Sequence, residues 1–195
     1  MDFYHGTIVG GLTELRPFAN PDNNLKEACV YLTTSKQLAT HYILDKKARI
    51  GSCPMLDIRN DGILVFQEMF SGALEYIYKG LSGYIYHCVG DYPLNNDAKV
   101  RTCATSIQPV PVSDFDFITD VYERIIEYSK YGTFIYEKYE ELPRYRHDII
   151  RGHVIRHIKE HNLLENPESP GAHFYQDKWP KYWKEANVLY RSGLL

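Results

Sequence analysis

The chain has 195 residues and a mass of 22.7 kDa, a length that suits one packed core with or without a helical extension. Its formal net charge is -3 with both signs interspersed, so the basic surface expected of a nucleic-acid-binding protein is missing. Its four cysteines include no Cys-x-x-Cys pair, no apolar run is long enough to cross a membrane, and the N-terminus does not resemble a secretory signal. These features predict a reduced, cytoplasmic protein.

The N-terminal part alternates short apolar runs with loop signals. Strands are predicted over 3–7 and 28–33, separated by a Pro-, Asn- and Asp-rich loop over 16–26. Thr34 or Ser35 is a good N-cap for a following helix, whose apolar residues recur at helical spacing: Leu38, Ala39, Tyr42 and Ile43.

The middle of the chain continues with strand signals. Residues 50–58 are predicted to pair with 63–66 as a hairpin, through the turn signal Asn60-Asp61-Gly62. A helix is predicted over 71–81 and a strand over 84–89. Residues 101–112 are expected to be extended, with prolines that favour an edge position at Pro109 and Pro111.

Helical patterns dominate the rest of the sequence. Asp114 is expected to cap an amphipathic helix closed by Gly132, followed by a strand over 134–139 and a long helix over 142–164. The tail over 166–195 is predicted to be rich in loops, with Trp179 and Trp183 on a short helix that anchors it to the core. The composition therefore predicts a sheet core over 1–112 and a helical extension over 113–195, packed as one compact unit.

Two short segments carry a resemblance to a known family. They are Tyr4-His5-Gly6-Thr7 and Val30-Tyr31-Leu32-Thr33-Thr34-Ser35, with Ala39 and Tyr42 on the helix that follows. They resemble the His-Tyr-Glu branch of the ADP-ribosyltransferase-like superfamily, whose first strand carries His-Gly and whose second carries a tyrosine followed by small polar residues. The resemblance covers roughly the first 110 residues. It implies an α+β fold with a split antiparallel β-sheet core, and NAD as a substrate.

The resemblance also implies a role for five residues around one cleft. His5 would hydrogen-bond the ribose next to the nicotinamide, and the backbone of Gly6 would bind the carboxamide, where a side chain would block close approach. Tyr31 would stack on the nicotinamide ring, and Thr7 and Ser35 would line the path of the ribose and phosphates. Since loss of nicotinamide passes through an oxocarbenium-like state, a nearby carboxylate would stabilise the positive charge.

The family pattern has a glutamate at its third position, and this sequence does not match the pattern there. The strand that matches by order holds Gln108, which can orient a hydroxyl but carries no negative charge. Glu68, after the predicted strand over 63–66, and Glu75 are alternative acids. The expected function is therefore NAD-dependent ADP-ribosyl transfer or NAD glycohydrolysis, with an unassigned acceptor. The alternative is an inactive module that binds NAD or a related nucleotide, and an RNA 2′-phosphotransferase-like enzyme ranks third because the extended segments carry few arginines.

One further cluster stands outside this pattern. His153, His157 and His161 lie four residues apart on a predicted helix, a spacing that zinc accepts. The metalloprotease pattern needs a glutamate directly after the first histidine, and Val154 stands there instead. Basic residues also lie nearby, so the sequence favours a solvated helix face, and no metal site is expected.

Overall fold

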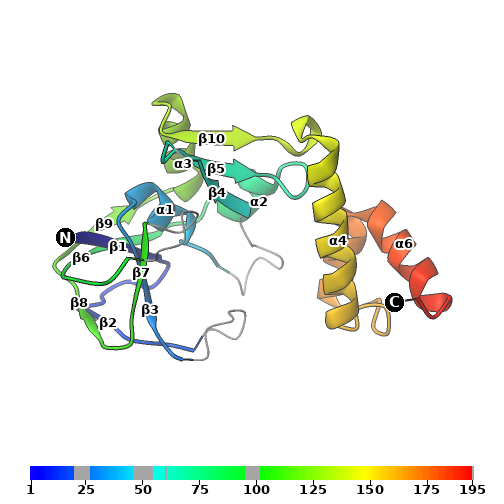
Figure 1. Ribbon diagram of the computed structural model, residues 1–195, viewed down its shortest axis with the longest axis horizontal. Helices are drawn as coiled ribbons and strands as arrows, with labels where there is room; N and C mark the ends of the chain where they lie inside the picture. The colour runs from blue at the N-terminus through cyan, green and yellow to red at the C-terminus, as the bar shows by residue number, and fades with distance from the viewer. Residues whose placement is uncertain (20–26, 46–54, 60, 95–101, 195) are drawn as a thin grey trace. The chain divides into compact units, whose positions relative to one another are not determined.

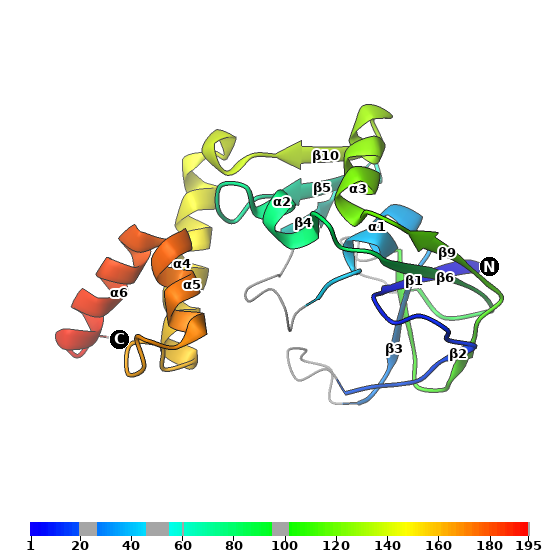
Figure 2. The same ribbon diagram turned by 180° about the vertical axis from the view of Figure 1, so that it is seen from behind.

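A computed structural model describes residues 1–19, 27–45, 55–59, 61–94 and 102–194 (Figures 1 and 2). These residues form an α+β fold with antiparallel sheets, ten strands and six α-helices, which confirms the mixed class predicted from the sequence. The chain divides into two compact units. The first comprises Met1–Asp45, Leu56–Phe66 and Tyr78–Tyr136, and the second comprises Lys46–Met55, Gln67–Ile77 and Glu137–Leu195.

The first unit is built on a five-stranded antiparallel sheet. Its strands follow the order β7 (Cys103–Ser106), β3 (Val30–Thr33), β1 (Asp2–Thr7), β6 (Gly83–Val89) and β9 (Asp114–Ile118). Strands β1, β3 and β6 confirm three of the strands predicted from apolar runs. The central pair is fixed in register with His5 opposite Tyr86 and Thr7 opposite Tyr84.

Helix α1 (Lys36–His41) packs on this sheet. It begins after Ser35, whose hydroxyl accepts a hydrogen bond from the backbone N–H of Leu38 at 3.2 Å, so the predicted N-cap is confirmed. A buried cluster of the first unit gathers residues from β1, β3, β6, β7 and the short strands β2 (Glu14–Leu15) and β8 (Val110–Pro111). Its members are Phe3, Leu15, Val30, Leu32, Tyr86, Cys88, Ala104 and Val110.

The expected hairpin is part of a three-stranded sheet. This sheet has the order β10 (Phe134–Glu137), β5 (Leu64–Gln67) and β4 (Met55–Ile58). The turn between β4 and β5 is closed by the amide of Gly62, which donates to the carbonyl of Arg59 at 2.8 Å. Gly62 has a φ of 85°, a left-handed conformation that favours glycine at this position.

The prediction of a helix that begins at Asp114 is wrong for its first residues. Residues 114–118 form β9, because Phe115 and Phe117 alternate with aspartates and pack on Tyr86 and Tyr84 of β6. Helix α3 (Val121–Lys130) starts only after Asp120, whose carboxylate accepts from the amide of Glu123 at 3.1 Å. The first unit therefore continues past residue 112, where the change in composition had placed a boundary.

The second unit is mainly helical. It contains most of α2 (Ala73–Tyr78), the 3-10 helix η1 (Tyr139–Glu141), and the helices α4 (Arg144–Glu160), α5 (Pro170–Lys178) and α6 (Pro180–Arg191). The tail predicted as loop-rich is thus mostly helical: Pro170 and Pro180 each stand in the first turn of a helix, where proline is tolerated.

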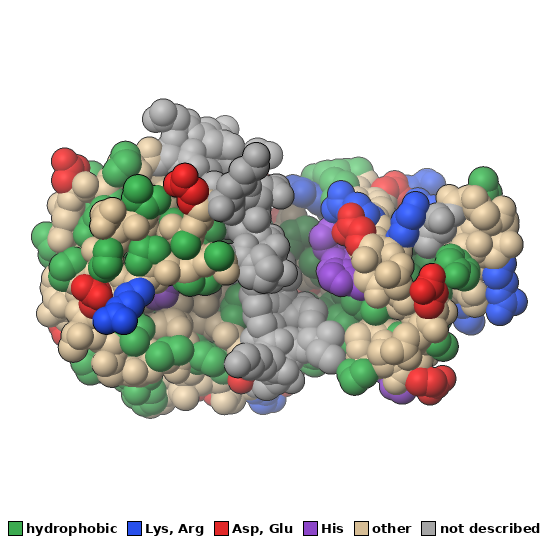
Figure 3. All heavy atoms as spheres, turned by 90° about the horizontal axis from the view of Figure 1, so that it is seen from below, with side chains coloured by type: hydrophobic (Ala, Val, Ile, Leu, Met, Phe, Trp, Pro, Cys, Tyr) green, Lys and Arg blue, Asp and Glu red, His purple; other side chains and the backbone are tan. Residues whose placement is uncertain are grey.

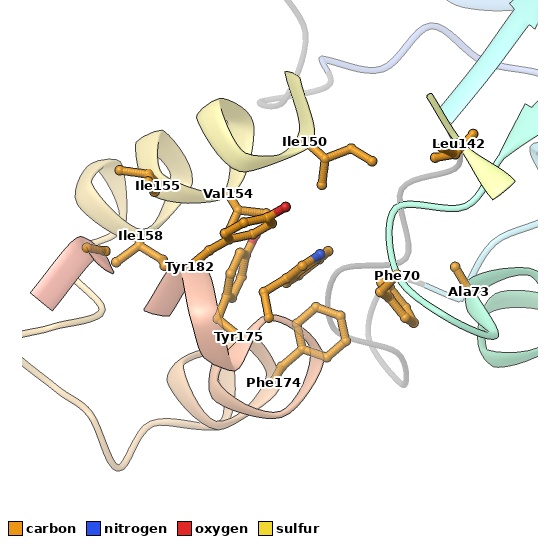
Figure 4. Close-up of a cluster of buried hydrophobic side chains, with 12 residues drawn as sticks. Phe70, Ala73, Leu142, Ile150, Val154, Ile155, Ile158, Phe174, Tyr175 and Tyr182 are labelled. Atoms are coloured by element: carbon orange, nitrogen blue, oxygen red, sulfur yellow. The ribbon is translucent and has the colours of Figure 1, made fainter. Parts of the chain in front are cut away.

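Aromatic side chains fill the core of the second unit. Figure 4 shows Val154, Tyr175 and Tyr182 from three helices pointing toward one another in this cluster. Trp179, 5% exposed, joins α5 to α6, and its indole N–H donates to the carbonyl of Met69 at 2.8 Å. Trp183 packs against the same cluster, so both tryptophans anchor the C-terminal helices. Over the described residues, no helix is both long and apolar enough to span a membrane.

Candidate functional site

His5 is held in one tautomer by the backbone of the neighbouring strand. Its Nδ1 lies 2.8 Å from the carbonyl oxygen of Tyr31, and because a carbonyl only accepts, Nδ1 carries the proton and donates it. Nε2 is then left with a lone pair. Burial lowers the pKa of His5 below its ordinary value, an effect that the bond to Tyr31 partly offsets. At neutral pH the ring is therefore an uncharged hydrogen-bond acceptor at Nε2.

A cavity of about 510 Å³ lies against this histidine in the first unit. Its wall includes His5 and Thr7 from β1, Val30 from β3, and a segment that carries Glu14, Arg16 and Phe18. The volume falls in the range of small-molecule sites, and the wall combines apolar surface with a few polar groups. The structure thus brings two of the predicted site residues, His5 and Thr7, to one cavity.

Glu14 and Arg16 belong to the segment that lines the cavity, on the short strand β2 and the residue that follows it. Pairing of Glu14 with Pro111 and of Leu15 with Val110 holds β2 against β8, and Leu15 is buried. Oε1 of Glu14 accepts from Nε of Arg16 at 3.1 Å. These two residues were not predicted as site residues, because a two-residue strand whose partner is far along the chain leaves no periodic signal.

The residue types of Gly6 and Ser35 are explained by the packing of α1. A Cβ on Gly6 would lie 1.8 Å from the carbonyl oxygen of Ala39, so only glycine permits α1 to approach β1. Successive strand residues point to opposite faces, so Gly6 faces α1 while His5 and Thr7 face the cavity. The Ser35 hydroxyl caps α1, and neither residue is part of the described cavity wall.

Tyr31 reaches the site through its backbone. Its carbonyl oxygen orients His5, while its ring meets Phe18 edge-to-face with centroids 6.0 Å apart. Val30 and Leu32, its neighbours on β3, are buried in the cluster that includes Phe3. By the alternation of the strand, the Tyr31 ring points to the other face, and it is not among the described residues that line the cavity.

Gln108 lies outside any strand, which corrects its predicted position. Strand β7 ends at Ser106, and Gln108 is exposed in the turn that follows. The Ser106 hydroxyl donates to the carbonyl of Gln108 at 2.8 Å, and the amide of Gln108 donates back to that hydroxyl at 3.2 Å. These bonds tighten the turn, and the Gln108 side chain is not among the described residues around the cavity.

Glu68 belongs to the second unit and is 1% exposed. Its carboxylate accepts three backbone hydrogen bonds, from the amides of Gly72 at 3.3 Å, Leu74 at 3.2 Å and Tyr139 at 3.2 Å. The alternative acid Glu75 stands in the first turn of α2. The acceptor capacity of Glu68 is therefore used to hold the loop before α2 and the start of η1.

His153 and His157 of α4 and His161, which caps its C-terminus, lie along one side of the helix. The rings of His153 and His157 have centroids 6.0 Å apart, and those of His157 and His161 are 4.1 Å apart. Figure 3 shows histidine side chains beside lysine or arginine side chains on the second unit. Nowhere in the described part of the chain do three histidine, cysteine or acidic side chains come together as a metal site.

The chain was compared with protein-family models, curated proteins and solved structures, and none of them matches it. The function must therefore be inferred from the geometry of the site.

Proposed function

We propose that the first unit binds NAD in the cavity beside His5 and breaks the bond between nicotinamide and ribose, as an ADP-ribosyltransferase or NAD glycohydrolase. The main support is the state of His5. With Nδ1 donating to the carbonyl of Tyr31, Nε2 accepts a hydrogen bond from a ligand at the cavity wall. A ribose hydroxyl is such a donor, in agreement with the role that the family resemblance implies for this histidine.

The charge state of His5 also suits this reaction. Its pKa is lowered by burial, so the ring is neutral at pH 7. A protonated imidazole would place a positive charge beside a sugar that itself becomes positive as nicotinamide leaves. A neutral ring can orient a ribose hydroxyl without this repulsion.

The rest of the cavity wall fits the parts of a nucleotide. Phe18, 49% exposed, offers apolar surface to a flat ring, and the hydroxyl of Thr7 offers a hydrogen bond to a sugar. Arg16, in the segment that lines the cavity, carries an exposed guanidinium, the group that matches phosphate oxygens with two parallel hydrogen bonds.

In the proposed reaction the bond between ribose C1′ and the nicotinamide ring nitrogen breaks. Its electron pair stays with nicotinamide, which becomes neutral, and the ribose carries the positive charge. A nucleophile then forms a new bond at C1′ and loses its proton to solvent. Water as the nucleophile yields ADP-ribose, and a hydroxyl or amine of an acceptor yields an ADP-ribosylated product.

Binding without cleavage is the second candidate. It is favoured by the positions of Gln108, in an exposed turn, and Glu68, whose carboxylate is used by three backbone amides. Neither residue is among the described residues that line the cavity beside His5. A protein of this kind would hold NAD or a related nucleotide and leave it intact.

The test is nicotinamide release from NAD by the purified chain, with His5→Ala as the variant. We expect the variant to release nicotinamide about 10²-fold more slowly than the unchanged chain. His87→Ala is the matched control, because His87 lies on β6 of the same sheet and pairs with Asp2 at 2.7 Å. Equal rates for the chain and His5→Ala would contradict the proposal. NAD binding by calorimetry without release, weakened in His5→Ala, would select the binding module.

A further inference from the structure

Strand β9 forms one end of the five-stranded sheet of the first unit. It pairs with β6 (Figure 2), and no described strand pairs with its other side. The opposite end of the sheet differs, because Leu94 forms a bridge to Ala104 of β7 and covers part of that edge. An open edge offers backbone N–H and C=O groups to a further strand. Over the described residues, β9 is therefore the more open edge of this sheet.

The backbone of β9 directs hydrogen-bonding groups to this open side. The amide of Phe115 donates to the carboxylate of its own neighbour Asp114 at 2.7 Å, so β6 does not supply its acceptor. In an antiparallel strand every second residue points its N–H and C=O to the same side, so Phe117 shares the direction of Phe115. A segment laid along β9 meets the backbone groups of these two residues.

The side chains of Phe115 and Phe117 form an apolar patch beside this edge. They are 52% and 50% exposed, and their rings pack on Tyr84 of β6 with centroids 5.7 and 5.0 Å away. These contacts fix both rings on one face of the sheet. Lysine and proline often prevent further pairing at an edge strand, and β9 contains neither. Half-exposed aromatic rings beside an open edge are typical of a surface that binds another chain.

The other face of this edge is acidic. Asp114 and Asp116 alternate with the two phenylalanines along β9. Asp2 shares this face, because it pairs with His87, the residue opposite Asp114. Lys36 of α1 pairs with Asp116 and offsets part of this negative charge. A second copy of the chain would bring the same acids to the edge, whereas a basic segment is attracted to it.

We propose that β9 is a docking edge for an extended segment of a partner protein in which apolar residues alternate with lysine or arginine. The segment adds to the sheet as an antiparallel strand, with its apolar side chains on the two phenylalanines and its basic side chains beside Asp114 and Asp116. Main-chain hydrogen bonds supply the attraction, and the two faces select the sequence. The inference goes beyond the proposed function, because none of these residues is among the described residues that line the cavity.

The probe is a short synthetic peptide of alternating valine and lysine, titrated into the chain and followed by NMR. We expect it to slow hydrogen exchange of the Phe117 amide. A peptide of alternating valine and glutamate should bind about 10-fold more weakly. In antiparallel pairing the N–H groups of the valines face β9, so N-methylation of the valines should weaken binding about 10-fold, and N-methylation of the lysines is the matched control.

Variants of the chain separate the aromatic face from the acidic face. Phe117→Ser should weaken binding of the valine–lysine peptide about 10-fold, and Tyr131→Ser, at an exposed residue after α3, should leave it unchanged. Asp114→Lys should reverse the preference, so that the valine–glutamate peptide binds more tightly. Exchange of amides in β1 verifies that the sheet is intact in each variant.

Three results would overturn this inference. They are equal binding of the lysine and glutamate peptides, unchanged exchange of the Phe117 amide, and a dimer of the chain in solution that Phe117→Ser disrupts. The dimer would show that a second copy occupies β9. Because nicotinamide release enters none of these measurements, each of these results leaves the proposed function standing.

Discussion

Two glutamates, one in each unit, use the same side chain in opposite ways. In the second unit, Glu68 is buried before α2 and its carboxylate accepts hydrogen bonds from three backbone amides. In the first unit, Glu14 is half-exposed on a cavity wall and contacts one guanidinium. A carboxylate satisfied by backbone donors belongs to the fold, whereas a half-exposed one beside a cavity retains capacity for a ligand.

The difference is a matter of hydrogen-bond partners, which the sequence does not display. Both glutamates stand near apolar residues, and Glu68 is the more conspicuous of the two because it directly follows the apolar run of β5. The number of backbone donors around a carboxylate is set by how a loop closes. It is therefore a better guide to function than position relative to a strand.

The largest effect on the free energy of unfolding is expected from Glu68→Ala. It leaves the buried amide of Leu74 and the part-buried amides of Gly72 and Tyr139 without their acceptor, which we expect to destabilise the second unit by about 3 kcal/mol. Both tryptophans of the chain, Trp179 and Trp183, lie in this unit, so their fluorescence during urea unfolding reports its stability. Glu160→Gln, at the exposed end of α4, is the control and should change stability by less than about 0.5 kcal/mol.

A free energy of unfolding unchanged by Glu68→Ala would show that water replaces the lost acceptor. Glu68 would then no longer contrast with Glu14, and its carboxylate would again be a candidate for chemistry.

A loss of stability of nearly the same size is expected in the first unit at acid pH. His41 is 0% exposed, Nδ1 donates to the carbonyl of Gln37 at 2.8 Å, and burial lowers its pKa to about 4. The unfolded chain takes up this proton near pH 6.5, and the folded chain takes it up only near pH 4. Stability should therefore be constant above pH 6.5 and fall by roughly 3 kcal/mol as the pH falls to 4.

His41→Leu removes this titration, so the variant should lose less stability between pH 7 and pH 4 than the unchanged chain. The measurement is hydrogen–deuterium exchange of amides in α1 and β5, which surround His41 in the first unit. The same pH dependence in both chains would assign the acid sensitivity to other groups, of which His5 is the first to examine, because burial also lowers its pKa.

The sequence was sufficient where a local pattern carries the structure. Apolar runs predicted β1, β3 and β6, and the hydroxyl before α1 predicted its start. The sequence predicts helix over residues 114–118 because Phe117 is also in register with the apolar stripe of α3. They form a strand because they pair with β6, and this pairing joins residues that lie far apart in the chain.

The site residues, too, were predictable only where a local pattern in the sequence marks them. His5 and Thr7 were predicted from one short strand, and the cavity contains both. Gly6 was expected to bind a carboxamide through its backbone, which stays a prediction; what the structure shows is that a Cβ there would meet the carbonyl oxygen of Ala39. Glu14 could not be predicted, since β2 is two residues long and its place depends on pairing with β8.

The smallest effect is expected for the stability of Glu14→Gln. Its contact with Arg16 is exposed, and pairs of this kind contribute about 0–1 kcal/mol. Exchange of amides in β1 and β6 should therefore give a free energy of unfolding within about 0.5 kcal/mol of the unchanged chain. A loss of 2 kcal/mol or more would mean that Glu14 supports the fold as Glu68 does. A small change in stability would instead separate the two glutamates by their hydrogen bonds, since the carboxylate of Glu68 holds backbone amides and that of Glu14 contacts one exposed side chain.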